Sequence, residues 1–169
     1  MLKELVRDIP DFPKEGIVFK DITPLFLNPA SLKEIIDKIS GHYKDEKIDV
    51  IVGAEARGFL IGPAIAINLK TGFVPIRKPG KLPYKTASKT YQLEYGTDTV
   101  EIHKDAIKPN DKVLMVDDLL ATGGTMAACC DLVESLKGEI MGCAFIIELT
   151  FLNGRKALNN YDVFSLIQY

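Results

Sequence analysis

The stretch VLMVDDLLATGGT, residues 113–125, decides the fold of this 169-residue chain. Its apolar first part is typical of a buried strand, and two adjacent acids, Asp117 and Asp118, follow directly. It then closes on a pair of glycines, and a helix is expected over residues 122–136. The stretch therefore predicts a strand that passes through a short turn into a helix.

The rest of the chain repeats this alternation of strand and helix patterns. Residues 29–43 place Leu32, Ile35, Ile36 and Ile39 on one helical face, after an N-cap at Asn28. Apolar strands that alternate with helices predict an α/β fold, a mostly parallel central sheet flanked by helices, in which ligands bind at the carboxyl ends of the strands. The expected strands cover residues 48–53, 73–77, 112–118, 139–149 and 162–169, and the expected helices cover residues 29–43, 57–69, 122–136 and 153–158.

Two segments interrupt the alternation, although the length of the chain suits one domain over residues 1–169. Residues 7–26 carry three prolines and should fold as a small N-terminal hood, about residues 1–28, over the domain. Residues 78–99 form a polar insertion with interrupting Pro and Gly, and an insertion of this length is usually a functional lid or a disordered loop. Within it, YQLEY and TVEIH flank Gly96 and predict a hairpin. We therefore expect a hood and a long flexible loop beside the sheet.

The composition narrows the class of partner. The net charge is −2 and the Lys and Arg residues are dispersed, which argues against nucleic acid as a partner. No apolar run approaches the length of a membrane span, and the charged N-terminal residues do not resemble a secretion signal. Cys129, Cys130 and Cys143 lack metal-site spacing and are expected as core thiols. We therefore expect a cytoplasmic protein that binds neither membrane nor nucleic acid.

The turn at residues 121–125 has the properties of an anion site. It lacks the lysine of a nucleotide P-loop and the Gly-x-Gly-x-x-Gly of a dinucleotide fold, so neither motif accounts for it. Backbone N–H groups between a buried strand and a helix, together with two threonine hydroxyls, can nevertheless receive a phosphate. The turn by itself is equally compatible with a plain strand-to-helix connection that uses Gly for its backbone angles and Thr as the N-cap.

The two aspartates favour a more specific ligand. At an effective dielectric constant of about 20, a carboxylate about 8 Å from a dianionic phosphate costs about 4 kcal/mol, so Asp117 and Asp118 must serve something else. Two carboxylates at the end of a buried strand repel each other unless donors or a metal satisfy them. The vicinal hydroxyls of a sugar are suitable donors, although a helix-capping pair remains an alternative. A phosphate turn beside two such acceptors describes a site for ribose 5-phosphate.

These residues also carry a resemblance. The stretch at residues 113–125 resembles the phosphoribosyl-pyrophosphate signature of the type I phosphoribosyltransferase family. Other segments resemble the adenine-specific members of that family, and together they span nearly the whole chain. These segments are GIVFKDITP at 16–24, GAEARGFLIGP at 53–63, IRKPGKLP at 76–83, LEYG at 93–96 and FSLIQY at 164–169.

The resemblance implies a reaction of adenine with phosphoribosyl pyrophosphate that gives AMP and pyrophosphate, with Mg²⁺ carried by the substrate and with a homodimer as the working form. Glu94, in LEYG, matches the proposed catalytic glutamate of the family. Lys20 and Ala56 stand where some relatives have arginine and serine. By position, the resemblance assigns Ala121, Thr122, Gly123, Gly124 and Thr125 to the 5-phosphate, Asp117 and Asp118 to the ribose, Glu55, Ala56, Arg57, Arg77, Lys78 and Lys81 to the pyrophosphate, and Val18, Phe19, Lys20 and Leu119 to adenine.

Two alternatives remain open on the sequence. The same chemistry on hypoxanthine, guanine, xanthine or a pyrimidine would need a different hood, and the segment GIVFKDITP favours adenine. A regulatory protein that keeps the sugar-phosphate site and binds nucleic acid would need a basic surface or an added DNA-binding domain, and the sequence shows neither.

Overall fold

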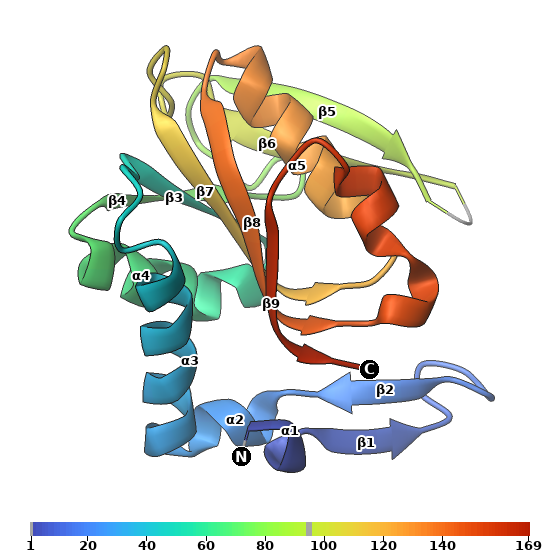
Figure 1. Cartoon of the computed structure of the whole chain (residues 1–169). Helices are drawn as coiled ribbons and strands as arrows, with labels where there is room; N and C mark the ends of the chain where they lie inside the picture. The colour runs from blue at the N-terminus through green and yellow to red at the C-terminus, as the bar shows by residue number, and fades with distance from the viewer. Residues whose placement is uncertain (1, 94–95) are drawn as a thin grey trace.

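A computed structural model describes residues 2–93 and 96–169 and contains the expected parallel sheet (Figure 1). Its strands are β3 (Val50–Ala54), β4 (Gly72–Ile76), β7 (Lys112–Leu120), β8 (Glu139–Glu148) and β9 (Val163–Gln168). They are hydrogen-bonded in the order β4-β3-β7-β8-β9, and every neighbouring pair is parallel. The α/β prediction is confirmed.

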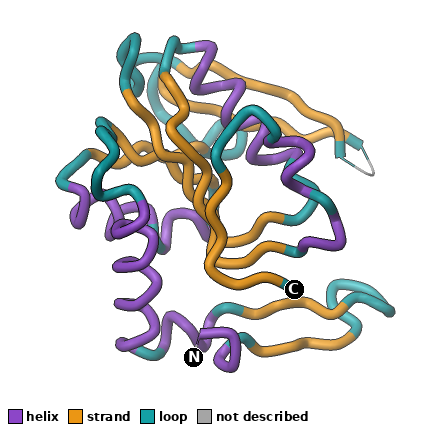
Figure 2. The backbone as a smooth tube through the Cα atoms, in the orientation of Figure 1, coloured by secondary structure: helices purple, strands orange, loops and turns teal. Residues whose placement is uncertain are grey.

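Helices cover both faces of this sheet (Figure 2). On one face lie α3 (Pro29–His42) and α4 (Gly62–Leu69), and on the other lies α5 (Gly124–Ser135). The segment between β4 and β7 adds an antiparallel hairpin of β5 (Thr86–Gln92) and β6 (Thr97–His103), which packs against α5. The predicted N-cap of α3 is confirmed, because Asn28 Oδ1 accepts hydrogen bonds from the backbone of Ala30 at 2.9 Å and of Ser31 at 3.1 Å.

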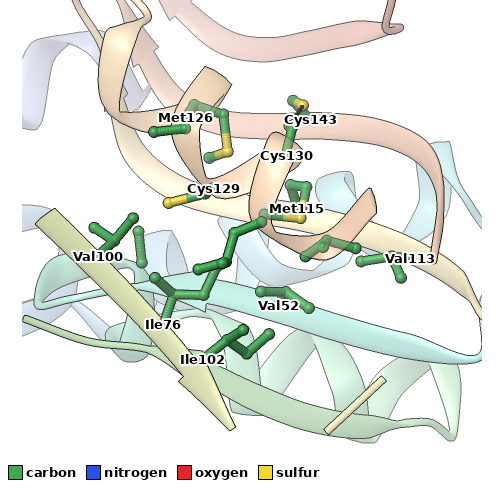
Figure 3. Close-up of a cluster of buried hydrophobic side chains, with 14 of the residues drawn as sticks. Val52, Ile76, Val100, Ile102, Val113, Met115, Met126, Cys129, Cys130 and Cys143 are labelled. Carbon is green, nitrogen blue, oxygen red and sulfur yellow. Dashed lines mark hydrogen bonds between the residues drawn. The ribbon is translucent and has the colours of Figure 1, made fainter. Parts of the chain in front are cut away.

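The core on the α5 side joins three layers of the fold (Figure 3). Met115 of the sheet, Ile102 of the hairpin and Cys129 of α5 are all buried in the same apolar cluster. All three cysteines are free and buried, as predicted, and the sulfur atoms of Cys130 and Cys143 lie 3.7 Å apart. This cluster fixes the hairpin and α5 against the sheet.

The N-terminal residues form a small separate layer at the end of the molecule where the chain also finishes (Figure 1). It comprises α1 (Leu2–Leu5), the antiparallel strands β1 (Arg7–Pro10) and β2 (Val18–Asp21), and α2 (Thr23–Leu27). Lys3 Nζ donates to the Gln168 carbonyl at 2.6 Å, and Lys20 Nζ lies 4.2 Å from the centre of the Tyr169 ring. These contacts hold the N-terminal layer against the end of β9.

Several elements differ from the sequence-based expectation. The strand β7 continues to Leu120, two residues beyond its expected end, because its pairing with β8 extends to that residue, so the two aspartates lie within the strand and not at its end. The helix expected at residues 57–69 divides into the 3₁₀ helix η1 (Arg57–Leu60) and α4, which has Pro63 in its first turn, where a missing N–H costs nothing. The hairpin pairs from Thr86 onward, five residues earlier than expected, because β5 stays in register with β6 as far as His103.

The remaining differences are small. Residues 153–158 fold as the 3₁₀ helix η3 (Gly154–Leu158), preceded by η2 (Thr150–Leu152), and not as an α-helix. Among the residues that the structure describes, no helix has the length and apolar character that crossing a membrane would require.

Candidate functional site

A cavity of about 280 Å³ opens at the carboxyl ends of β3 and β7, where ligands bind in parallel sheets of this kind. It collects twelve residues that the sequence assigned to a site: Glu55, Ala56, Arg57, Lys78, Asp117, Asp118, Leu119, Ala121, Thr122, Gly123, Gly124 and Thr125. It does not include Val18, Phe19, Lys20, Arg77 or Lys81 among its lining residues. Glu94 lies outside the residues that the structure describes.

The turn before α5 presents its backbone to the cavity. Gly123 is the N-cap of α5, with φ of 84°, and no side chain of the described residues caps it by a hydrogen bond. The alternative in which a threonine caps the helix is therefore wrong. The N–H of Ala127 is bonded to the carbonyl of Gly123 at 2.9 Å, which leaves the N–H groups of the preceding turn directed outward from the helix end. Such a helix terminus favours an anion.

Close packing explains why this turn needs glycine. A Cβ atom on Gly123 would lie 2.4 Å from the carbonyl oxygen of Gly154, and one on Gly154 would lie 2.3 Å from that of Ala121. The turn and η3 therefore touch through their backbones, with no room for a side chain between them. This contact fixes the position of the turn relative to the sheet.

At the wall of the cavity Asp118 is buried and Asp117 half-buried, and each has a different partner. Asp118 Oδ2 lies 2.8 Å from Arg57 Nε, and Asp117 Oδ1 accepts the backbone N–H of Asp118 at 2.9 Å. Burial raises the pKa of Asp117 well above its usual range, and the neighbouring Asp118 carboxylate adds to the rise. Burial also raises the pKa of Asp118, and Arg57 opposes this. Two adjacent carboxyls on a cavity wall, with raised pKa values, are acceptors that hydroxyl donors of a ligand would stabilise.

The loop after β3 brings Arg57 to the acids. The peptide bond between Glu55 and Ala56 is cis. A Cβ atom on Gly58 would lie 2.9 Å from the Val116 carbonyl oxygen, so glycine allows η1 to lie directly against β7. The guanidinium carbon of Arg57 is 5.6 Å from the centre of the Phe19 ring, which connects the acids to the N-terminal layer.

The other basic residues divide between the cavity and its surroundings. Glu55 Oε2 accepts the backbone N–H of Lys78 at 2.9 Å and Arg77 Nε at 3.2 Å. The hydrogen bond from the Lys78 backbone N–H is the main cause that lowers the pKa of Glu55. The Glu55 carboxylate is therefore charged, and Lys78 and Arg77 already donate to it. Arg77 also donates to the Lys81 carbonyl at 3.3 Å. The structure therefore brings the Lys78 side chain to the cavity, whereas Arg77 is directed toward Glu55.

The residues expected to bind a base lie in two places. Leu119 lines the cavity, and Phe19 adjoins it through Arg57. Lys20 Nζ is paired with Asp8 Oδ1 at 2.7 Å, and Val18 is 51% exposed. The side chains of Val18 and Lys20 therefore point away from the cavity, which leaves only their backbone groups for a base.

Sequence reasoning missed six lining residues: Tyr91, Leu93, Asp98, Leu120, Met126 and Phe145. Tyr91 and Asp98 face each other across the β5–β6 hairpin. Neither residue type marks a site by itself, but a hairpin prediction with the correct register would have paired them. Leu120, Met126 and Phe145 belong to β7, α5 and β8 and are ordinary core positions in the sequence, whereas Leu93 is exposed and directly follows β5.

Comparison with known proteins agrees with this geometry. The Phosphoribosyl transferase domain family matches residues 22–168. The adenine phosphoribosyltransferase of Trichlorobacter lovleyi is 61% identical over 168 residues, which cover 99% of this chain and 98% of that protein. The chain belongs to the adenine phosphoribosyltransferase family.

Solved structures of adenine phosphoribosyltransferases have the same fold. The crystal structure of the protein from Thermoanaerobacter pseudethanolicus superposes with a TM-score of 0.97 at 52% identity, covering 99% of this chain and 98% of that one. The Saccharomyces cerevisiae protein superposes with a TM-score of 0.94 at 47% identity, covering 98% of this chain and 96% of that one. That protein is complexed with D-2,5-dideoxy-2,5-imino-altritol 1,6-bisphosphate and adenine. Because these matches span almost the whole chain, they include the N-terminal layer that precedes residue 22.

Proposed function

We propose that this protein transfers the 5-phosphoribosyl group from phosphoribosyl pyrophosphate to adenine and releases AMP and pyrophosphate, a reaction of purine salvage. One observation carries the proposal: the adjacent acids Asp117 and Asp118 share a cavity with a helix N-terminus that no side chain of the described residues caps. The similarity to adenine phosphoribosyltransferases over the whole chain supports adenine over the other bases, and an enzyme over a regulatory protein.

The phosphoribosyl group binds along β7 and the turn that follows it. The backbone N–H groups and hydroxyls of Ala121, Thr122, Gly123, Gly124 and Thr125 bind the 5-phosphate. Several N–H donors hold an anion without a nearby cation, since each hydrogen bond to a charged group contributes about 1.5 to 3 kcal/mol. Asp117 and Asp118 accept the ribose hydroxyls, and these hydrogen bonds stabilise the two adjacent carboxylates. The phosphate and the acids therefore occupy opposite ends of the sugar.

Pyrophosphate binds between the loop after β3 and the start of the long loop. Arg57 and Lys78 line the cavity there and supply positive charge, and Glu55 and Ala56 line it beside them. Arg77 and Lys81 belong to the same subsite by family resemblance, and reach it only if Arg77 leaves Glu55. Glu55 is charged and therefore orders the basic residues and does not itself bind the anion.

The donor set of the cavity fits Mg²⁺ carried by the substrate. Within the described part of the chain, no three His, Cys, Asp or Glu side chains gather to hold a metal ion by themselves. Mg²⁺ characteristically keeps several waters and binds one or two carboxylates together with substrate phosphates, so Asp117 and Asp118 are its available protein ligands. When bound, the ion neutralises charge on the departing pyrophosphate.

Adenine binds between Phe19 and Leu119, with the backbone of Val18 and Lys20 along its edge. Loss of pyrophosphate leaves a sugar with oxocarbenium character, so groups that fix the ring and oppose its positive charge accelerate the reaction. The acid pair is placed to do both. Glu94 is proposed as the catalytic residue for proton transfer, and residues 78–99 as the lid that excludes water.

The working form is proposed to be a homodimer in the cytoplasm. Arg77 and Lys81 do not line the cavity of their own chain, and the family resemblance implies that such residues reach pyrophosphate across a dimer interface. Sedimentation equilibrium measures this directly, and a fully active monomer would contradict it.

The test of the function is a panel of bases with phosphoribosyl pyrophosphate and Mg²⁺, in which pyrophosphate release is followed. Adenine is expected to react at least about a hundredfold faster than hypoxanthine, guanine, xanthine or uracil, because a site that hydrogen-bonds one base edge leaves polar groups unpaired with another. A control reaction without any added base measures the hydrolysis of phosphoribosyl pyrophosphate. Absence of release with adenine would refute the proposed function.

A further inference from the structure

A chain of polar contacts joins the β5–β6 hairpin to two separate parts of the cavity wall. Asp98 of β6 accepts a hydrogen bond from Lys78 Nζ and lies 3.3 Å, through Oδ2, from the hydroxyl of Tyr91 on β5. The same Tyr91 hydroxyl lies 3.2 Å from Thr125 Oγ1 in the first turn of α5. All four residues line the cavity. One aspartate therefore contacts, directly or through tyrosine, residues at both proposed anion subsites.

The direction of each hydrogen bond in this chain follows from the charge of Asp98. The bond from Lys78 is the main cause that lowers the pKa of Asp98, and the backbone N–H of Thr99 also donates to it at 2.8 Å. A charged carboxylate only accepts, so the single hydroxyl hydrogen of Tyr91 is directed to Asp98. The Thr125 hydroxyl must then donate to Tyr91. The donors of both Lys78 and Thr125 are thus directed to the hairpin.

We propose that Asp98 is a positioning residue that competes with substrate anions for their donors: it holds the Lys78 ammonium directly and the Thr125 hydroxyl through Tyr91, and substrate binding must displace both contacts. The inference rests on the proposed function, because that function assigns Lys78 to pyrophosphate and Thr125 to the 5-phosphate. It adds that one side chain of the hairpin competes with both ends of phosphoribosyl pyrophosphate.

Asp98 is expected to weaken, and not to strengthen, the binding of substrate anions for two reasons. An ammonium paired with a carboxylate presents little net charge to an incoming anion. The carboxylate itself also repels that anion, because it lies on the wall of the same small cavity. Asp98→Asn removes the negative charge yet keeps an oxygen that accepts from Lys78 and Tyr91, so it changes the electrostatics and little of the shape.

The hairpin offers a matched control. Lys89 of β5 pairs with Asp131 of α5 at 2.8 Å, and neither residue lines the cavity. Both side chains of this pair are about half exposed, at 44% and 49%. Asp131→Asn therefore removes an aspartate that anchors the same hairpin to the same helix without changing the charge inside the cavity.

The experiment measures binding of inorganic pyrophosphate, with Mg²⁺ present, by titration calorimetry to the wild-type protein, Asp98→Asn and Asp131→Asn. Asp98→Asn is expected to bind pyrophosphate about threefold to tenfold more tightly than the wild-type protein, because it loses a partly exposed ion pair that competes with the ligand. Asp131→Asn is expected to bind pyrophosphate with about the wild-type affinity. The KM for phosphoribosyl pyrophosphate should fall by a similar factor in Asp98→Asn while kcat does not rise.

A second variant tests the other branch of the contact chain. Tyr91→Phe frees the Thr125 hydroxyl but leaves Asp98 on Lys78, so ribose 5-phosphate should bind more tightly and pyrophosphate equally. Equal or weaker pyrophosphate binding by Asp98→Asn, or the same gain in Asp131→Asn, would overturn the inference. A wild-type protein that binds no pyrophosphate would instead refute the proposed function on which the inference rests.

Discussion

Gly123→Ala is the substitution whose effect the structure defines best. Gly123 has φ of 84°, a conformation that costs a residue with a Cβ atom about 1 to 2 kcal/mol. The added Cβ atom would also lie 2.4 Å from the Gly154 carbonyl oxygen, so the backbone of η3 or of the turn must move. Such overpacking costs about another 1 to 3 kcal/mol. The expected loss in the free energy of unfolding is therefore about 2 to 5 kcal/mol.

Gly16→Ala is the matched control for this prediction. Gly16 has the same φ of 84°, and a Cβ atom there would meet nothing within 4 Å. Gly16→Ala should therefore lower the free energy of unfolding only by the conformational cost, about 1 to 2 kcal/mol. Urea unfolding of both variants separates the two costs, because their difference isolates the clash with Gly154.

The same substitution should impair binding of the 5-phosphate. Displacement of the turn that loses even one hydrogen bond to a charged group costs about 1.5 to 3 kcal/mol, which raises the KM for phosphoribosyl pyrophosphate at least about tenfold. Gly16→Ala should leave that KM unchanged. If Gly123→Ala were no less stable than Gly16→Ala and had a wild-type KM, the assignment of the turn to the phosphate would be refuted.

Three further predictions concern the acids and the proposed catalytic residue. Replacing Asp117 and Asp118 together by Asn should raise the KM for phosphoribosyl pyrophosphate at least about tenfold, through lost bonds to the ribose, whereas unchanged steady-state kinetics would contradict the ribose assignment. Glu94→Ala should slow turnover while largely sparing AMP binding in calorimetry, and wild-type turnover would refute its role. The raised pKa of Asp117 means that the folded protein binds this proton more tightly than the unfolded chain, so the carboxyl destabilises the fold increasingly as the pH rises above its ordinary pKa of 3.8. Urea unfolding should therefore show Asp117→Asn more stable than wild type at pH 8, with a difference that shrinks toward pH 4; a difference that grows on acidification would contradict this.

The sequence predicts the sheet and the cavity well because both depend on local patterns. Apolar strands that alternate with helices imply a parallel sheet, and such a sheet brings the loops after its strands to one edge. Asp118 and Arg57, which are far apart in the chain, are both found on the cavity wall for this reason. The start of α5 is less well predicted, because the sequence left a threonine cap open and the structure has Gly123 at the N-cap.

What the sequence does not predict depends on contacts between distant segments. Asp118 pairs with Arg57, and Glu55 pairs with Arg77. The residue types alone do not determine which acid pairs with which arginine. The Tyr91 and Asp98 pair depends on the register of the hairpin, and β5 is mostly polar, so its sequence offers little pattern to align with Val100 and Ile102 of β6. The extension of β7 likewise depends on its neighbour β8.

The most direct test of the account is a crystal structure of the protein with AMP. The 5-phosphate oxygens are expected within about 3.2 Å of the backbone nitrogens of the turn at residues 121–125. The ribose hydroxyls should face Asp117 and Asp118, and adenine should lie between Phe19 and Leu119. A phosphate bound elsewhere, or ribose hydroxyls that meet neither carboxylate, would contradict it.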